Sequence, residues 1–137
     1  MSICQLFFPP PKRMTSDKMN QYKTIIVDDE WLILSELRSL LNQFPAIKIV
    51  GEASNINEAA RLISACRPDV VFLDIHMPGG SGFDLLERIK INFKIIFVTA
   101  YDQYRNNKWI SKAEAYLMKP ISREQLARVI HNLSISQ

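Results

Sequence analysis

Acidic side chains follow two of the apolar runs in this chain. Val70–Leu73 (VVFL) is followed by Asp74, and Lys23–Val27 (KTIIV) by the acidic stretch Asp28–Glu30 (DDE). Carboxylates that are brought together repel one another and lose hydration, so folding tolerates them only with a compensating cation. A hard divalent ion that prefers oxygen ligands, usually Mg²⁺, is the natural partner. The two acidic strand ends therefore predict a divalent-metal site.

Two further apolar runs end in side chains that can contact a phosphoryl group. Lys94–Val98 (KIIFV) is followed by Thr99, and Ala115–Met118 (AYLM) is followed by Lys119. Such runs are typical of buried strands in a parallel sheet, and open α/β sheets bind ligands at the carboxyl ends of their strands. Four ends that carry acid, acid, hydroxyl and ammonium suit one task, which is to hold a metal ion and a phosphoryl group on an aspartate.

These residues carry a resemblance to a known family. From about Tyr22 to Leu133 the sequence resembles the receiver domain of a bacterial two-component response regulator, with five functional positions in order, each at a strand end. The stretches TAYDQY (Thr99–Tyr104) and YLMKPIS (Tyr116–Ser122) resemble the LytTR (LytR/AlgR) class of regulators. The resemblance implies an α/β fold with a doubly wound, five-stranded parallel sheet of order 2-1-3-4-5, as in flavodoxin-like folds.

The resemblance also implies roles for four side chains. Asp74 is the expected phosphoacceptor, and Lys119 is expected to pair first with its carboxylate and then with the phosphoryl oxygens. Thr99 is expected to donate its hydroxyl to the phosphoryl group. Tyr116 is expected to be the switch aromatic that moves inward when Thr99 is drawn away. The peptide bond between Lys119 and Pro120 is expected to be cis.

The implied cofactor is Mg²⁺. Its expected ligands are Asp29 directly, Asp28 mostly through water, Asp74, and the backbone carbonyl of His76. A lone histidine beside acids also suggests zinc, but no second histidine or cysteine has suitable spacing. In receivers, the residues two positions beyond the phosphoacceptor and the threonine flank the path of the hydrolytic water. Here these are the bulky His76 and Tyr101, which predict slow loss of the phosphoryl group.

Helical periodicity and capping residues predict the remaining elements. The expected helices are 31–43, 57–66 with Asn55 as its cap, 82–91, 102–111, and one that begins at the Ser122/Gln125 capping box and ends near Leu133; a further strand is expected at 47–53. The helix at 102–111 is the weakest, because Asn106 and Asn107 are mediocre helix formers. Trp109 is interpreted as its core anchor rather than as a partner contact.

The composition fits one soluble domain and argues against nucleic-acid binding. Of 137 residues, 47% are hydrophobic and 23% are charged, which is ordinary for a globular protein. Residues 1–22 account for most of the net charge of +3, so the rest is too nearly neutral for strong phosphate-backbone binding. Cys4 and Cys66 form no spaced framework, which favours a reducing cytoplasm, and no segment predicts membrane association.

The expected domain organisation has three parts. Residues 1–21 are expected to be a disordered tail or the product of an early start codon, with Met14 or Met19 as the true start; a docking segment built on Phe7 and Phe8 is the alternative. Residues 22–133 form the receiver domain. Residues 134–137 are expected to begin a linker or to be a short C-terminal tail.

The predicted function is a phosphorylation-controlled switch that accepts phosphoryl from a sensor histidine kinase and does not turn over a separate substrate. We interpret the chain as the receiver part of a transcriptional regulator, which would contact DNA only through an output domain absent from these residues. The alternative is a stand-alone receiver acting by protein–protein contact. A homodimer through the face of helix four, strand five and helix five is expected. An aspartyl phosphatase is disfavoured because Asp74-Ile-His-Met lacks a second acid, and a flavodoxin because no phosphate loop follows the first strand.

Overall fold

The computed structural model describes residues 21–135, without the side chain of Ile135. Apart from Gln21, the expected tail at 1–21 lies outside the described residues, and so do residues 136 and 137. The first of the five strands begins at Tyr22, where the receiver domain was expected to start. Helix α5 (Arg123–Ile135) continues past Leu133, where the last helix was expected to end.

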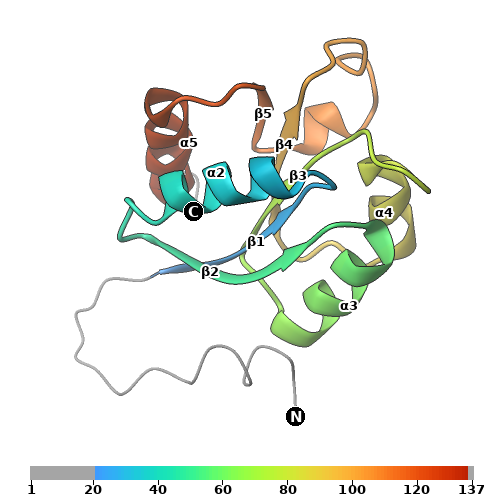
Figure 1. Cartoon of the computed structure of the whole chain (residues 1–137), viewed down its shortest axis with the longest axis horizontal. Coiled ribbons are helices and arrows are strands. Elements are labelled where there is room, and N and C mark those ends of the chain that lie inside the picture. The colour runs from blue at the N-terminus through green and yellow to red at the C-terminus, as the bar shows by residue number, and fades with distance from the viewer. Residues whose placement is uncertain (1–20, 136–137) are drawn as a thin grey trace.

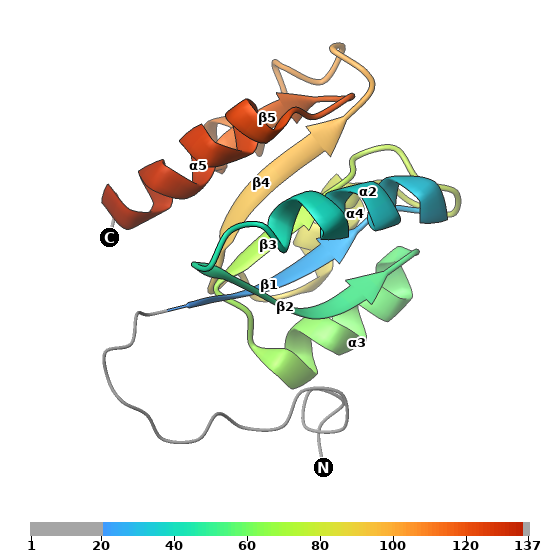
Figure 2. The ribbon, with the colours of Figure 1, turned by 60° about the vertical axis from the view of Figure 1, so that its left-hand side comes forward.

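The five strands form one sheet in the order β2-β1-β3-β4-β5, and every neighbouring pair is parallel (Figures 1 and 2). The strands are β1 (Tyr22–Val27), β2 (Ile47–Ala53), β3 (Val70–Leu73), β4 (Lys94–Thr99) and β5 (Ala115–Met118). This confirms the predicted doubly wound sheet. Because all five run in the same direction, the residues that follow them gather along one edge of the sheet.

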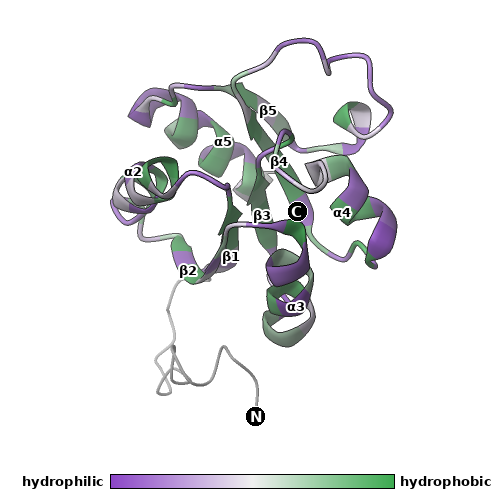
Figure 3. Cartoon of the chain, turned by 45° about the vertical axis from the view of Figure 1, so that its right-hand side comes forward, coloured by the Kyte–Doolittle hydropathy of each residue, from purple (hydrophilic) through white to green (hydrophobic). Residues whose placement is uncertain are grey.

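Helices cover both faces of the sheet. The other helices are α2 (Trp31–Leu41), α3 (Ile56–Cys66) and α4 (Gly82–Arg88). Successive side chains of a strand point to opposite faces, so on β3 Val71 packs beneath α3 and α4 whereas Phe72 packs beneath α2 and α5. Hydrophobic residues therefore make up most of the sheet, whereas the helices carry both hydrophobic and hydrophilic residues (Figure 3).

Side-chain caps begin three of the helices where the sequence contains capping residues. The Asn55 side chain accepts a hydrogen bond from the N–H of Glu58 (2.8 Å), which confirms it as the cap of α3. The predicted capping box of Ser122 and Gln125 is also present, with reciprocal bonds of 2.9 and 3.1 Å. A capping box of Ser81 and Asp84 starts α4. Each box satisfies N–H groups that the first turn of a helix leaves without partners.

The helix predicted at 102–111 is wrong. In its place the chain forms turns and one short 3-10 helix, η1 (Ile110–Lys112). The N–H groups of Asn107 and Ile110 each donate to the carbonyl three residues earlier, and the Asn107 side chain accepts from the N–H of Trp109 at 2.8 Å. An asparagine that bonds the backbone two residues on stabilises a turn in competition with a helix.

The remaining differences concern helix ends. Helix α2 ends at Leu41 rather than at 43, α3 starts one residue earlier than predicted, and α4 ends at Arg88 rather than at 91. After α2 the N–H of Gln43 bonds the carbonyl three residues back, so the last turn is tightened, and Ile89 after α4 is already extended. No helix within residues 21–135 is long and apolar enough to cross a membrane.

Candidate phosphoryl-acceptor site

Asp74 lies directly after β3 and is almost fully buried, with 3% of its surface exposed. Its N–H donates to the Val27 carbonyl (3.0 Å), which ties the end of β3 to the end of β1. Gly82, at the start of α4, packs against the Asp74 backbone so closely that a Cβ atom there would lie 2.5 Å from the Asp74 carbonyl oxygen. Only a glycine fits at this position, so Gly82 helps to fix the Asp74 backbone.

Asp28 and Asp29 follow β1, the strand next to β3. Single carboxylate oxygens of Asp28, Asp29 and Asp74 lie within 4.8 Å of one another. Asp28 is buried, and its carboxylate also accepts a hydrogen bond from the N–H of Glu30 (2.9 Å), whereas Asp29 is exposed. The sheet order thus brings together the two acidic stretches that are far apart in the sequence.

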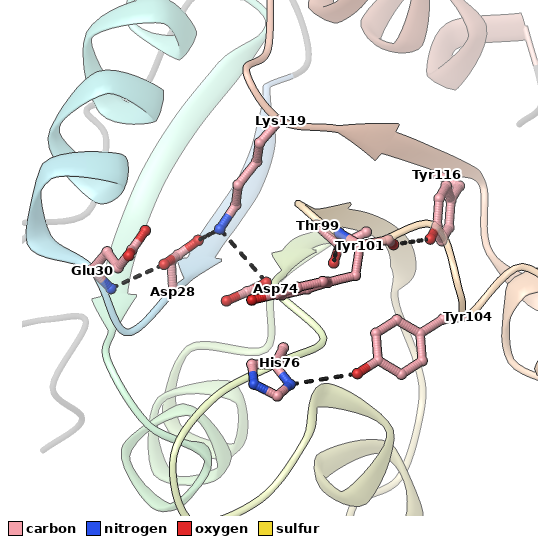
Figure 4. Close-up of polar contacts among 9 residues, drawn as sticks. All are labelled: Asp28, Glu30, Asp74, His76, Thr99, Tyr101, Tyr104, Tyr116 and Lys119. Carbon is pink, nitrogen blue, oxygen red and sulfur yellow. Dashed lines mark hydrogen bonds and ion pairs between the residues drawn. The ribbon is translucent and has the colours of Figure 1, made fainter.

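Lys119 places an ammonium group between the acids (Figure 4). Its Nζ lies 2.7 Å from an Asp28 oxygen and 3.6 Å from an Asp74 oxygen. The Lys119 N–H donates to the carbonyl of Thr99 (2.8 Å), which fixes the end of β5 beside the end of β4. The expected cis bond between Lys119 and Pro120 is confirmed.

The charges of the site shift the protonation of two groups. Burial, together with the charges of Asp28 and Asp29, raises the pKa of Asp74 from 3.8 to about 7, although the Lys119 ammonium and the backbone N–H of His76 favour its ionised form. Burial lowers the pKa of Lys119, but the hydrogen bond to Asp28 and the charges of Asp74 and Asp28 outweigh it and raise the pKa above its usual value. Lys119 is therefore charged, and it does not fully compensate three carboxylates.

Thr99 and Tyr116 lie on the β4 and β5 side of the site. Thr99 is fully buried, and its hydroxyl oxygen accepts a hydrogen bond from the N–H of Tyr101 (3.2 Å). The Tyr116 hydroxyl donates to the Tyr101 carbonyl (2.7 Å), and the Arg105 guanidinium lies over the Tyr116 ring. Tyr116 thus points to the segment after β4 and not to the carboxylates (Figure 4).

His76 lies beside Asp74 and flanks the site (Figure 4). The imidazole is exposed, its Nδ1 lies 3.4 Å from the Tyr104 hydroxyl, and its ring meets that of Tyr101 edge-on at 5.0 Å between centroids. Sequence reasoning missed two residues here. Tyr104 gave no signal beyond its place in the TAYDQY stretch, and Gly82 gave none beyond a glycine before the third helix.

The donor set suits a hard metal ion. Three carboxylates supply oxygen ligands, and an excess of negative charge remains beside one lysine. Oxygen-only coordination with net negative charge is what Mg²⁺ prefers, whereas zinc sites use histidine and cysteine. The predicted cluster of Asp28, Asp29 and Asp74 is therefore an acidic pocket that can hold a metal ion.

Known proteins are similar to this chain in sequence and in fold. Residues 24–131 match the family of response regulator receiver domains. The sensory transduction protein LytT of Enterococcus faecalis is 40% identical over 113 residues, which are 80% of this chain and 47% of LytT. The transcriptional regulatory protein BtsR of Salmonella typhimurium is 41% identical over 113 residues, 81% of this chain and 47% of BtsR. The chain thus spans about half the length of the curated relatives it matches.

Solved structures of response regulators have a similar fold. The response regulator TrrA of Thermotoga maritima, in complex with Mg²⁺ and BeF, has a TM-score of 0.73 at 32% identity, over 84% of this chain and 99% of that chain. A DNA-binding response regulator of the LuxR family from Staphylococcus aureus has a TM-score of 0.72 at 29% identity, over 81% and 97%.

The parallel sheet with acids and a lysine at its carboxyl edge defines the class of receiver domains. This chain belongs to the response regulator receiver domain family of two-component systems. Its relatives LytT and BtsR are LytTR-type regulators, the class that the TAYDQY and YLMKPIS stretches resemble.

Proposed function

We propose that this receiver domain accepts a phosphoryl group on Asp74 from the phosphohistidine of a sensor histidine kinase. One observation carries the proposal: the buried Asp74 carboxylate shares a pocket with Asp28 and Asp29 and lies 3.6 Å from the Lys119 ammonium. An Asp74 oxygen attacks phosphorus while the P–N bond breaks, and the electron pair of that bond and a proton remain on the kinase imidazole. The product is a phosphoaspartate, and the chain turns over no separate substrate.

The cofactor in this proposal is Mg²⁺, held by Asp29 directly, by Asp28 mostly through water, by Asp74 and by the His76 carbonyl. When bound, Mg²⁺ neutralises charge on the phosphoryl oxygens and the carboxylates. The raised pKa of Asp74 supports this role, because a carboxyl with a pKa of about 7 is about half protonated near neutral pH and a protonated carboxyl is a poor nucleophile. The nearby cation favours the ionised form.

Lys119 and Thr99 are the proposed phosphoryl contacts. The Lys119 Nζ lies farther from an Asp74 oxygen (3.6 Å) than from an Asp28 oxygen (2.7 Å). A small movement of the ammonium therefore suffices to bring it to a phosphoryl oxygen on Asp74. The Thr99 hydroxyl only accepts from Tyr101, so its own proton is available to donate. Movement of Thr99 would pull the Tyr101 backbone and break the bond from Tyr116, which frees the Tyr116 ring to turn inward as the switch.

The proposed setting is cytoplasmic, with residues 22–133 as the receiver and a DNA-binding output domain as its target. The name of the relative BtsR, a transcriptional regulatory protein, supports an output in transcription. The face formed by residues 100–113, β5 and α5 is the proposed homodimer contact. Because turns replace helix four there, its outline differs from the one expected from the sequence.

Labelling tests the function directly. Acetyl phosphate or a phosphorylated kinase, with Mg²⁺, should label the wild type, and Asp74→Asn should take up no label. Asp69→Asn is the matched control, since Asp69 lies before β3 at the opposite end and Asn keeps an acceptor for the Lys23 N–H. Lys119→Ala should fold but show no phosphorylation-dependent change in tryptophan fluorescence. Label that survives in Asp74→Asn would refute the assignment.

A further inference from the structure

The His76 imidazole is held by two tyrosines that come from one distant segment. Tyr101 contacts its ring edge-on, with centroids 5.0 Å apart, and the Tyr104 hydroxyl lies 3.4 Å from Nδ1 (Figure 4). An exposed histidine side chain without such contacts would sample several rotamers. Here a ring contact and a polar contact both restrict it.

The Tyr104 ring is itself held in place by aromatic contacts. Its ring meets that of Phe83 in α4 edge-on, with centroids 5.7 Å apart, and Phe83 meets the buried Phe97 of β4 in the same way at 5.4 Å. Edge-to-face aromatic pairs prefer this geometry. The rings of Phe97, Phe83 and Tyr104 therefore form a row from the sheet interior to the surface. This packing holds the Tyr104 hydroxyl in place next to His76.

We propose that Tyr104 is a positioning residue: its hydroxyl donates to Nδ1 of His76 and holds the imidazole at the mouth of the Asp74 pocket, where it limits access of water to the phosphoaspartate. This inference rests on the proposed function, since it concerns the lifetime of the group on Asp74. It adds a residue that touches neither the carboxylates nor the phosphoryl group. It also links the turn segment after β4 to the loop after β3.

The contact has a spectroscopic consequence in the unphosphorylated protein. A hydroxyl that donates to Nδ1 requires the proton of the neutral imidazole to be on Nε2. Tyr104→Phe keeps the ring row and removes only the hydroxyl. At about pH 8.5, the side-chain ¹⁵N resonance of His76 Nδ1 should move in this variant. His131 on α5 is the second of two histidines in the chain and should not change.

The same variant should shorten the life of the phosphoaspartate. We expect label loss to be faster by about two- to tenfold, the factor that corresponds to one ordinary hydrogen bond. A double-mutant cycle isolates the link: in a His76→Ala background, which keeps the backbone carbonyl, Tyr104→Phe should have no further effect on the rate.

Two results would overturn the proposal: an unchanged Nδ1 resonance in Tyr104→Phe, or the same acceleration of label loss with and without the His76 imidazole. Failure of the proposed function would look different. If the wild type took up no label, phosphorylation of Asp74 would be refuted, whereas the ¹⁵N measurement would still decide whether Tyr104 holds His76.

Discussion

Asp74 is buried beside two other carboxylates, so its ionisation works against folding when no metal is bound. Its pKa is raised from 3.8 to about 7 in the folded chain. Between these two pH values the folded state binds more protons than the unfolded state, so the free energy of unfolding falls as pH rises. The penalty is absent below about pH 4 and complete above about pH 7.

This predicts a pH-dependent difference between wild type and Asp74→Asn. In buffer with EDTA, the free energy of unfolding of the wild type should fall by about 1–3 kcal/mol relative to that of the variant between pH 5 and pH 8. The reason is that a shift of one pKa unit corresponds to about 1.4 kcal/mol. Urea unfolding at both pH values measures it. Taking the difference cancels the titration of groups that the two proteins share. A difference that stays constant or grows in favour of wild type would contradict the raised pKa.

Tyr101 gives a second residue-scale prediction. The residue is 45% exposed and its ring packs on His76, whereas its backbone N–H donates to the Thr99 hydroxyl oxygen. Tyr101→Ala keeps the backbone contact and removes the bulk that crowds the in-line approach of water. We expect phosphoaspartate to decay faster by up to about tenfold, or about 1.4 kcal/mol in the barrier. A rate that is unchanged or slower in Tyr101→Ala would count against shielding.

Most of the site's geometry could be expected from the sequence, because each residue sits at the end of a strand. Parallel strands place Asp28, Asp74, Thr99 and Lys119 at one edge whatever the details of the loops. The Tyr104–His76 contact could not be expected in this way. It joins two loops 28 residues apart in the chain, and no periodicity specifies how such loops meet.

At the scale of elements, the segment after β4 shows where local chemistry outweighs family pattern. The sequence predicted a weak helix at 102–111, and the structure has turns there. Asn107 bonds the Trp109 N–H through its side chain, and Asp102 pairs with Arg105. Trp109 still packs against the core beneath α3 and α4, while its Nε1 donates to Glu87 (3.0 Å). Packing of this tryptophan on the core was predictable, whereas the turns are stabilised by the Asn107 side chain, which no helical pattern indicates.

Replacing both asparagines should therefore favour the helix. Alanine is the better helix former by about 0.5 kcal/mol or more at each position, and Asn107→Ala also removes the bond to the Trp109 N–H. In Asn106→Ala/Asn107→Ala, ¹³Cα shifts of residues 102–112 should move towards helical values. Asn42→Ala/Asn92→Ala, outside the segment, is the control. Shifts that stay unchanged would show that tertiary contacts, rather than asparagine, hold the turns.

At the scale of the whole molecule, alternation of strand and helix was enough to predict the sheet. The strands β1, β3 and β4 each contain a buried run of apolar residues, and helices with one apolar face cover each side. Such strands pair in parallel only when crossover helices lie on the faces. The order of the strands came from the family resemblance, because neither apolar runs nor helical periods state which strand lies next to which.

A metal ion that binds at the ends of both β1 and β3 should stabilise the whole fold. Binding to the native state alone adds RT ln(1 + [L]/Kd) to the free energy of unfolding. With Mg²⁺ at ten times its Kd this is about 1.4 kcal/mol, which raises Tm by about 3–6 °C for a domain of this size. The rise should be larger at pH 8 than at pH 6, because the pKa of Asp74 is about 7 and its ionised form binds the cation.

Differential scanning calorimetry with MgCl₂, and with NaCl at matched ionic strength, measures this effect. Asp29→Asn should lose most of the rise, since Asp29 is the exposed acid of the cluster and the proposed direct ligand. Glu124→Gln, an exposed acid on α5, should keep it, and EDTA should reverse it in the wild type. If Mg²⁺ raised the Tm of Asp29→Asn as much as that of the wild type, the cation would be acting through general screening, and the acidic pocket would not be its site.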